Sequence, residues 1–237
     1  MKKILPYTLY FILYTAGGFS QGKDPSFYTH ISFTPVYSYY VNNKHHTTNT
    51  KPAFSFAFTA REEWRFTRGG ALVAGVEYFS HGFSFDSYFF APNRSFLYDK
   101  NFSYHYKVRM KEVDFPLLIR GNFINHTRKS VEGYFEIGAS LRYLYSSSMF
   151  VIDSTGIPLW DNPTKIEFET PLFARNMSMW MQFNWGLQFY HPDHKAGFFM
   201  EMNFRYAPIR FYINESFTPA DLYIQSFHIG IGAGFRF

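Results

Sequence analysis

The chain has 237 residues, a formal net charge of +5, 23% aromatic residues and no cysteine. The small excess of basic residues excludes a strongly basic nucleic-acid binder, and the lack of cysteine excludes disulfides, thiolate metal sites and cysteine nucleophiles. Hydrophobic residues make up 46% of the chain, which excludes a disordered protein. Two classes remain, a soluble aromatic-rich β domain and a β-barrel in a membrane.

The N-terminus has the pattern of a signal peptide. Lys2 and Lys3 precede an apolar stretch over 4–14, and small residues occupy the positions near 18–20 that a signal peptidase reads. We therefore expect residues 1–20 to be removed on export and residues 21–237 to form a single domain. The rest of the chain contains no run of about 18 uncharged apolar residues, so no helical membrane span is predicted.

The rest of the chain alternates apolar and polar residues in eight segments, which predicts strands that each have one apolar and one polar face. In the clearest segment, Met181, Phe183 and Trp185 share one face, and Gln182 and Asn184 share the other. The expected strands lie near 27–40, 54–65, 72–81, 102–123, 135–145, 173–190, 196–211 and 223–237.

The segment near 102–123 changes phase once. Tyr106 and Val108 have the apolar parity at first, whereas Phe115 and Leu117 have the opposite parity further on. A one-residue bulge near Lys111-Glu112 would exchange the two faces and turn Arg109 inward. Alternatively, the strand leaves the membrane at this point.

The connections alternate in length, which is typical of outer-membrane barrels with short periplasmic turns and long outside loops. An even number of strands returns both termini to the periplasm. The long connections cover about 41–52, 86–101, 147–171 and 212–222, and the shorter ones cover about 67–70, 123–130 and 191–195.

The polar faces distinguish a membrane barrel from a soluble sandwich. A sandwich exposes its polar face to water and needs many Lys and Glu there. Here the polar faces carry Gly, Ser, Asn, Gln and matched charges, and the apolar faces carry aromatics and Met that suit lipid. The predicted fold is therefore all-β, an eight-stranded antiparallel up-and-down transmembrane β-barrel in the outer membrane of a Gram-negative cell.

Two stretches carry resemblances to known sequences. Alternating apolar residues that end in a C-terminal Phe resemble the signal read by the bacterial barrel assembly machinery. Val113-Asp114-Phe115-Pro116-Leu117-Leu118-Ile119-Arg120, followed by Tyr134-Phe135-Glu136-Ile137-Gly138-Ala139-Ser140-Leu141, is similar to the motif pair of the PorT-like barrels of Bacteroidota. This resemblance implies an eight-stranded outer-membrane barrel and an accessory role in type IX protein secretion. The expected assembly-signal residues are Phe227, Ile229, Ile231, Phe235 and Phe237.

The polar faces predict a closed interior. An eight-stranded barrel is only wide enough for its own side chains, so charges inside it must pair. We expect a salt-bridged plug, in which inward glycines leave room for long Arg and Tyr side chains; a narrow polar conduit is the alternative. The expected interior residues are Arg61, Glu63, Arg65, Glu77, Arg109, Asp114, Arg120, Glu136, Arg142, Glu201, Arg205 and Arg236.

The long loops contain the most informative residues for binding. Their apolar stretches indicate a contact surface for another outer-membrane protein or segments that fold onto the barrel rim. We expect a non-enzymatic binding protein, scaffold or accessory subunit of an envelope or secretion complex, with outer-membrane lipid or lipopolysaccharide around it. The expected contact residues are Tyr88, Phe89, Phe90, Phe150 and Trp160.

No catalytic residue, metal site, cofactor or nucleic-acid motif is predicted. A lipid-modifying enzyme needs a serine with a histidine base within reach and a third group that orients the base. Two pairs, His30 with Ser32 and Ser226 with His228, have the inward parity, and His81 with Ser84 and Asp86 is a loose group at a strand end. The alternatives to a binding protein are such an enzyme and a small-solute channel.

Overall fold

The computed structural model describes residues 27–42, 50–66, 69–87, 89–90, 97–98, 104–124, 131–152, 177–190, 196–208, 211–212 and 223–237. The predicted signal peptide lies outside them. Eight long strands are β1 (Phe27–Asn42), β2 (Lys51–Arg65), β3 (Gly70–Ser87), β6 (Tyr104–Ile124), β7 (Val131–Ile152), β8 (Met177–Tyr190), β9 (Gly197–Tyr206) and β11 (Tyr223–Arg236). Three pairs of residues are β4 (Phe89–Phe90), β5 (Leu97–Tyr98) and β10 (Phe211–Tyr212).

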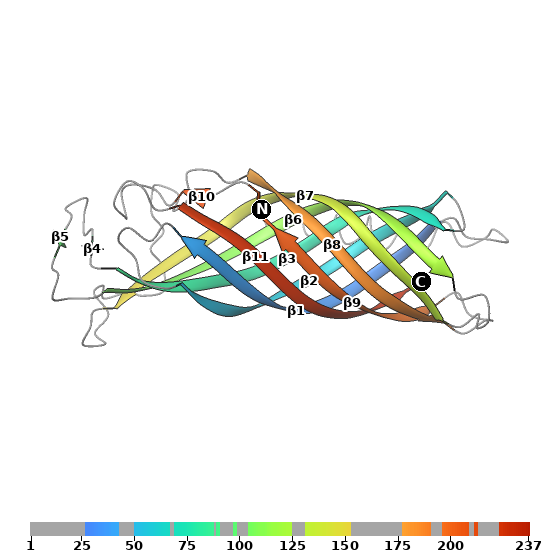
Figure 1. Cartoon of the computed structure of the whole chain (residues 1–237), viewed down its shortest axis with the longest axis horizontal. Coiled ribbons are helices and arrows are strands. Elements are labelled where there is room, and N and C mark those ends of the chain that lie inside the picture. The colour runs from blue at the N-terminus through green and yellow to red at the C-terminus, as the bar shows by residue number, and fades with distance from the viewer. Residues whose placement is uncertain are drawn as a thin grey trace, which may run out of the picture.

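The eight long strands form a closed antiparallel barrel (Figure 1). Each pairs with its neighbours in chain order, and β11 pairs with β1. At the seam, the Phe237 N–H donates to the Thr29 carbonyl (3.0 Å), and the Thr29 N–H donates back to Phe237 (3.2 Å). Closure satisfies the backbone groups that an open sheet edge would expose. The eight-stranded antiparallel barrel predicted from the alternation is confirmed. Among the described residues, no helix has the length and apolarity to span a membrane.

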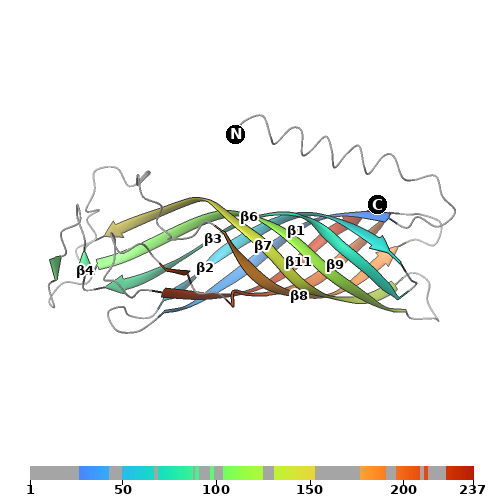
Figure 2. The ribbon, with the colours of Figure 1, turned by 90° about the horizontal axis from the view of Figure 1, so that it is seen from above.

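The two ends of the barrel differ. The terminal end is where β1 begins and β11 ends, and the long-loop end is the opposite one. β6 and β7 have 21 and 22 residues, whereas β9 has 10. β3, β6 and β7 extend past the other strands of the barrel at the left of Figures 1 and 2. The long-loop end therefore rises higher on one side of the barrel than on the other.

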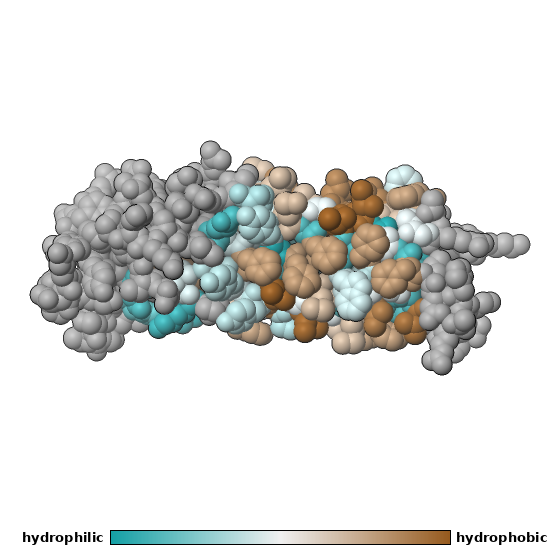
Figure 3. All heavy atoms as spheres, viewed as in Figure 1, coloured by the Kyte–Doolittle hydropathy of each residue, from teal (hydrophilic) through white to brown (hydrophobic). Residues whose placement is uncertain are grey.

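The outward surface carries a broad apolar band (Figure 3). Outward aromatic residues differ along the barrel axis: Phe and Trp residues such as Phe27, Trp64 and Phe235 lie near the terminal end. The tyrosines lie in the halves of their strands nearer the long-loop end, as aromatic belts at two membrane interfaces would. These outward tyrosines are Tyr37, Tyr39, Tyr143, Tyr145 and Tyr206.

The expected bulge is present, but the extra residue belongs to β7. Lys111 lies opposite Ser146 and Glu112 opposite Leu144, so Tyr145 has no register partner on β6. β6 therefore keeps one parity along its length, and the prediction that Arg109 faces the interior is wrong: its side chain is exposed. The outward face of β6 instead changes from apolar to cationic, as the alternative of a strand leaving the membrane requires.

Candidate functional site

The interior near the terminal end is filled by ion pairs centred on Glu63, which is 0% exposed. His30 Nε2 lies 2.7 Å and Arg65 Nε 2.5 Å from its carboxylate oxygens, and Arg236 Nη2 lies 3.4 Å away. Arg120 also pairs with it through Nη1. One carboxylate from β2 thus meets arginines from β2, β6 and β11 and the imidazole of His30 from β1. Loss of this carboxylate would leave buried arginines unpaired, which is costly.

A second group lies one layer further in. Arg61 donates to Glu136 (2.7 Å) and pairs with Glu201, and Arg120 Nε donates to the other Glu136 oxygen (2.9 Å). The Arg120 guanidinium also lies over the Tyr134 ring, with 3.8 Å from Cζ to the ring centre, and the Tyr134 hydroxyl donates to Glu201 (3.2 Å). The same arginines serve two carboxylates each, so the charges form one continuous network.

Gly186 makes room for this network, as the inward glycines were expected to do. A Cβ at this position would lie 2.5 Å from Cζ of Tyr134 and 2.7 Å from the Met200 carbonyl oxygen. Any larger residue would push the ring away from Arg120 or separate the strands. Glycine therefore allows a large aromatic residue to cross the narrow interior.

The middle of the barrel holds a smaller polar group. Arg205 pairs with Glu77, and its Nη1 lies 3.8 Å from Asp114. Thr59 donates to the second Glu77 oxygen (2.8 Å), and Arg205 Nε donates to Asn203 (2.7 Å). The Arg205 guanidinium also faces the Phe79 ring at 4.9 Å. This group joins the ionic half of the interior to an aromatic half.

Aromatic side chains dominate the interior near the long-loop end. Trp180 is 0% exposed and lies against His228, with 4.7 Å between the ring centres. Glu112 is enclosed among them: His81 Nε2 lies 2.9 Å and Arg142 Nε 3.3 Å from its oxygens, and the Tyr40 hydroxyl bonds to His81 Nδ1. The buried rings of this half are Tyr40, Phe79, His81, Phe83, Phe85, Tyr106, Trp180 and His228.

The expected interior residues other than Arg109 all lie inside the barrel, although the Arg65 side chain is 20% exposed. Sequence reasoning gave His30 the inward parity without including it in the charged interior, and it missed Glu112 and Glu132 as members. Glu132 accepts from Arg65 (2.9 Å) and has the same parity as Glu136. Glu112 lay at the position of the expected bulge, so no face was predicted for it. The parity of Asp114 on β6 and of Glu136 on β7 would have found both glutamates.

The serine–histidine groups considered for an enzyme do not assemble. His30 contacts Glu63, and His228 bonds to Ser38 (2.7 Å), both inside the barrel. His81 is buried, whereas Asp86 faces outward and pairs with His105 at 2.7 Å between Oδ1 and Nδ1. Within the described part of the chain, no three His, Asp or Glu residues group as metal ligands.

The expected loop contact residues lie largely outside the described residues. Tyr88 and Trp160 are not among them, and only the backbone of Phe89, Phe90 and Phe150 is described. β4 pairs with β5, and Phe150 on β7 lies opposite Lys107. The contact surface stays a prediction. The alternating residues of the expected assembly signal point outward along β11, and their recognition also stays a prediction.

The comparisons with known proteins bear on the fold alone. No family model and no curated protein matches the chain. The outer membrane protein OprG of Pseudomonas aeruginosa is similar at a TM-score of 0.52 and 12% identity, over 92% of this chain and 98% of that one. Neisserial surface protein A (TM-score 0.40, 11% identity, 88% and 96% covered) and Ail of Yersinia pestis (0.40, 13%, 90% and 99%) also align.

With the closed sheet, the likeness to OprG shows the fold of the eight-stranded outer-membrane β-barrels. Identities this low carry no function from one protein to another. Membership of the PorT-like family finds no support among these matches and stays a prediction.

Proposed function

We propose that the protein is an outer-membrane β-barrel that works by binding, as a scaffold or accessory subunit of an envelope or protein-secretion complex. The observation that carries this proposal is the filled interior. Ion pairs close the terminal half and packed rings close the long-loop half, so the barrel supplies a rigid wall rather than a conduit or a catalytic cavity. The function is then left to the outward surface and the loops.

The shape of the barrel supports a role for the long-loop end. β3, β6 and β7 extend past the other strands there, and the connection over 153–176 follows β7 directly. Long connections thus begin at the raised end of a rigid wall, which favours contact with another outer-membrane protein. The resemblance to PorT-like barrels favours a secretion complex as the setting, and the outward residues of β11 favour insertion by the barrel assembly machinery.

Purification of the tagged chain in a mild detergent tests the binding role. We expect one outer-membrane protein to remain bound in stoichiometric amount, as identified by mass spectrometry. Replacement of residues 155–174 by a short Gly-Ser linker should remove it, because this loop contains Trp160. The same replacement over 126–129, in the connection at the opposite end, should leave it bound. A wild-type chain without a stoichiometric partner, or equal loss in both variants, would contradict the proposal.

We further propose that the long-loop end faces the outside of the cell and that both termini are periplasmic. The native chain has no cysteine, so single replacements report position without background. Thr155→Cys should react with a membrane-impermeant maleimide on intact cells. Thr127→Cys should react only after the outer membrane is made permeable. The reverse pattern would invert the orientation, and reaction of both on intact cells would exclude a membrane-spanning arrangement.

A further inference from the structure

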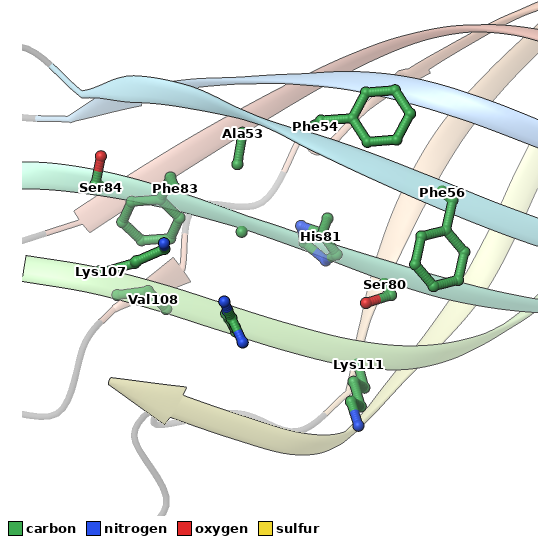
Figure 4. A pocket seen from close by; sticks show the side chains of 12 residues that line it. Ala53, Phe54, Phe56, Ser80, His81, Phe83, Ser84, Lys107, Val108 and Lys111 are labelled. Atoms are coloured by element: carbon green, nitrogen blue, oxygen red, sulfur yellow. The ribbon is translucent and has the colours of Figure 1, made fainter. Parts of the chain in front are cut away.

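A groove of about 490 Å³ opens on the outward surface of the barrel near the long-loop end, where β2, β3 and β6 lie side by side (Figure 4). The residues that matter for its chemistry are Phe54 and Phe56 on β2, Ser80 and Ser84 on β3, and Lys107 and Lys111 on β6. Most of its lining residues have the outward parity of their strands, whereas His81, Phe83 and Val108, which also border it, belong to the interior.

The backbone builds this groove. Pro52 lies opposite Phe83 and Phe56 opposite Ser80, so β2 has one more residue than β3 between the two pairs. Such an irregularity separates two strands locally. On the other side, a Cβ at Gly82 would collide with the Val108 carbonyl oxygen, so glycine alone allows β3 to approach β6 this closely. The small residues of β3 then form the floor of the groove.

The two sides of the groove differ in chemistry. Phe54 is 76% exposed on the β2 side. On the β6 side, Lys107 and Lys111 are both exposed, and the register places Ser84 opposite Lys107 and Ser80 opposite Lys111. Serine hydroxyls and lysine ammonium groups are both hydrogen-bond donors for an anion. The occupant that suits this surface therefore has an anionic part and an apolar part.

The two lysines are available for a ligand. Across the described residues, neither Lys107 nor Lys111 is part of an ion pair. Asp86, an outward carboxylate further along β3, is engaged by His105 at 2.7 Å. Arg109 lies between the lysines on the same face, but it already has a partner within the chain, so the inference depends on the lysines alone.

The position of the groove indicates which amphiphile it meets. The outward residues Ile119, Leu117 and Phe115 of β6 are apolar. Nearer the long-loop end, its outward residues Lys111, Arg109 and Lys107 are cationic. Across the sheet, Phe54 lies opposite Tyr37 of the tyrosine belt. Such a change from an apolar to a cationic surface beside tyrosines marks the level at which hydrocarbon gives way to lipid headgroups.

We propose that this groove binds an anionic membrane lipid whose headgroup carries phosphate, such as the phosphorylated glycolipid of an outer leaflet. Lys107 and Lys111 hold the phosphate with the help of the Ser80 and Ser84 hydroxyls. Phe54 and Phe56 contact the first carbon atoms of an acyl chain. This inference rests on the proposed placement of the barrel in an outer membrane with its long-loop end outside.

Titration of the full chain in a non-ionic detergent with lipid A, a bisphosphorylated and acylated disaccharide, tests the site by native mass spectrometry. We expect one lipid to bind selectively over its dephosphorylated form. Lys107→Ala with Lys111→Ala should weaken binding about thirtyfold, because each lysine near an anionic headgroup contributes about one kcal/mol. Arg128→Ala with Lys129→Ala removes the same charge at the opposite end and should leave binding unchanged. Heat-dependent gel migration checks that each variant is folded.

Three results would overturn the inference. Equal weakening by both double variants would indicate a general charge effect. Displacement of lipid A by millimolar inorganic phosphate, with no effect of Phe54→Ala, would indicate a site for free phosphate. Preferential binding of a sulfated polysaccharide, without lipid binding, would assign the lysines to a surface ligand of another class.

The failure of this inference is distinguishable from the failure of the proposed function. If the cysteine variants show the expected orientation but lipid A does not bind, then the groove alone is wrongly assigned. If the orientation is inverted or absent, then the proposed placement fails, and the groove loses its basis whatever lipid A does in detergent.

Discussion

Neutralising Glu63 is expected to lower the free energy of unfolding by about 3 to 5 kcal/mol, because Glu63→Gln leaves buried arginines without their shared carboxylate. Arg120 pairs with this carboxylate, and Arg65 and Arg236 lie 2.5 Å and 3.4 Å from it. Removing Arg120 as well should recover part of the loss, because Glu136 keeps Arg61 as a partner at 2.7 Å. Urea titrations in lipid vesicles would measure both variants and their coupling.

The neighbouring residue supplies a matched control. Glu62 points outward from the same strand, is half-buried, and accepts a hydrogen bond from the Thr29 hydroxyl at 2.9 Å. Glu62→Gln removes the same charge without leaving buried arginines, so its effect should stay within about 1 kcal/mol. If the two substitutions cost the same, the ionic network does not determine the stability of the barrel.

Truncating Trp180 is the second large effect, with an expected loss of about 3 to 5 kcal/mol. Its ring is fully enclosed between His228 and the Arg142 guanidinium, which lies 4.7 Å from the ring centre. Trp180→Ala would open a cavity in the aromatic half of the interior, and the closed barrel cannot collapse to fill it. The same urea titrations would report this loss.

Trp185 on the same strand is the control, because it faces outward and is 43% exposed. Trp185→Ala should cost about 1 to 2 kcal/mol, because lipid can fill the space that the ring leaves and no closed cavity forms. In a chain with Trp64→Phe and Trp160→Phe, lipids with brominated acyl chains should quench the fluorescence of Trp185 and leave Trp180 unaffected. Quenching that disappears in Trp180→Ala instead would place Trp180 on the lipid-facing side and contradict the interior described for β8.

The alternation of residues was enough to predict most of the interior. Arg61, Glu136 and Arg205 were assigned correctly to the inside, because a strand with one face in lipid has a single consistent parity. The pairing among these residues could not be predicted. Arg61 meets Glu136 from β7 and Glu201 from β9 only because the barrel closes and brings distant strands across a narrow lumen.

β6 shows where the reading of parity failed. The apolar residues of this strand change parity between Val108 and Phe115. A bulge in the strand and a passage from lipid to water both produce this pattern. Only the register with β7 distinguished them, because the extra residue, Tyr145, lies on the partner strand. Arg109 was therefore assigned to the wrong face, and Glu112 was missed as a buried partner of Arg142 and His81.

The sequence by itself determined the class of fold, because alternation with period two, sustained over eight segments, records which side of each strand meets lipid. It did not determine the aromatic half of the interior or the groove beside Lys107 and Lys111. Both depend on which residues of different strands lie opposite one another. That register is decided by the shear of the closed barrel and by local irregularities such as the one between Pro52 and Phe56.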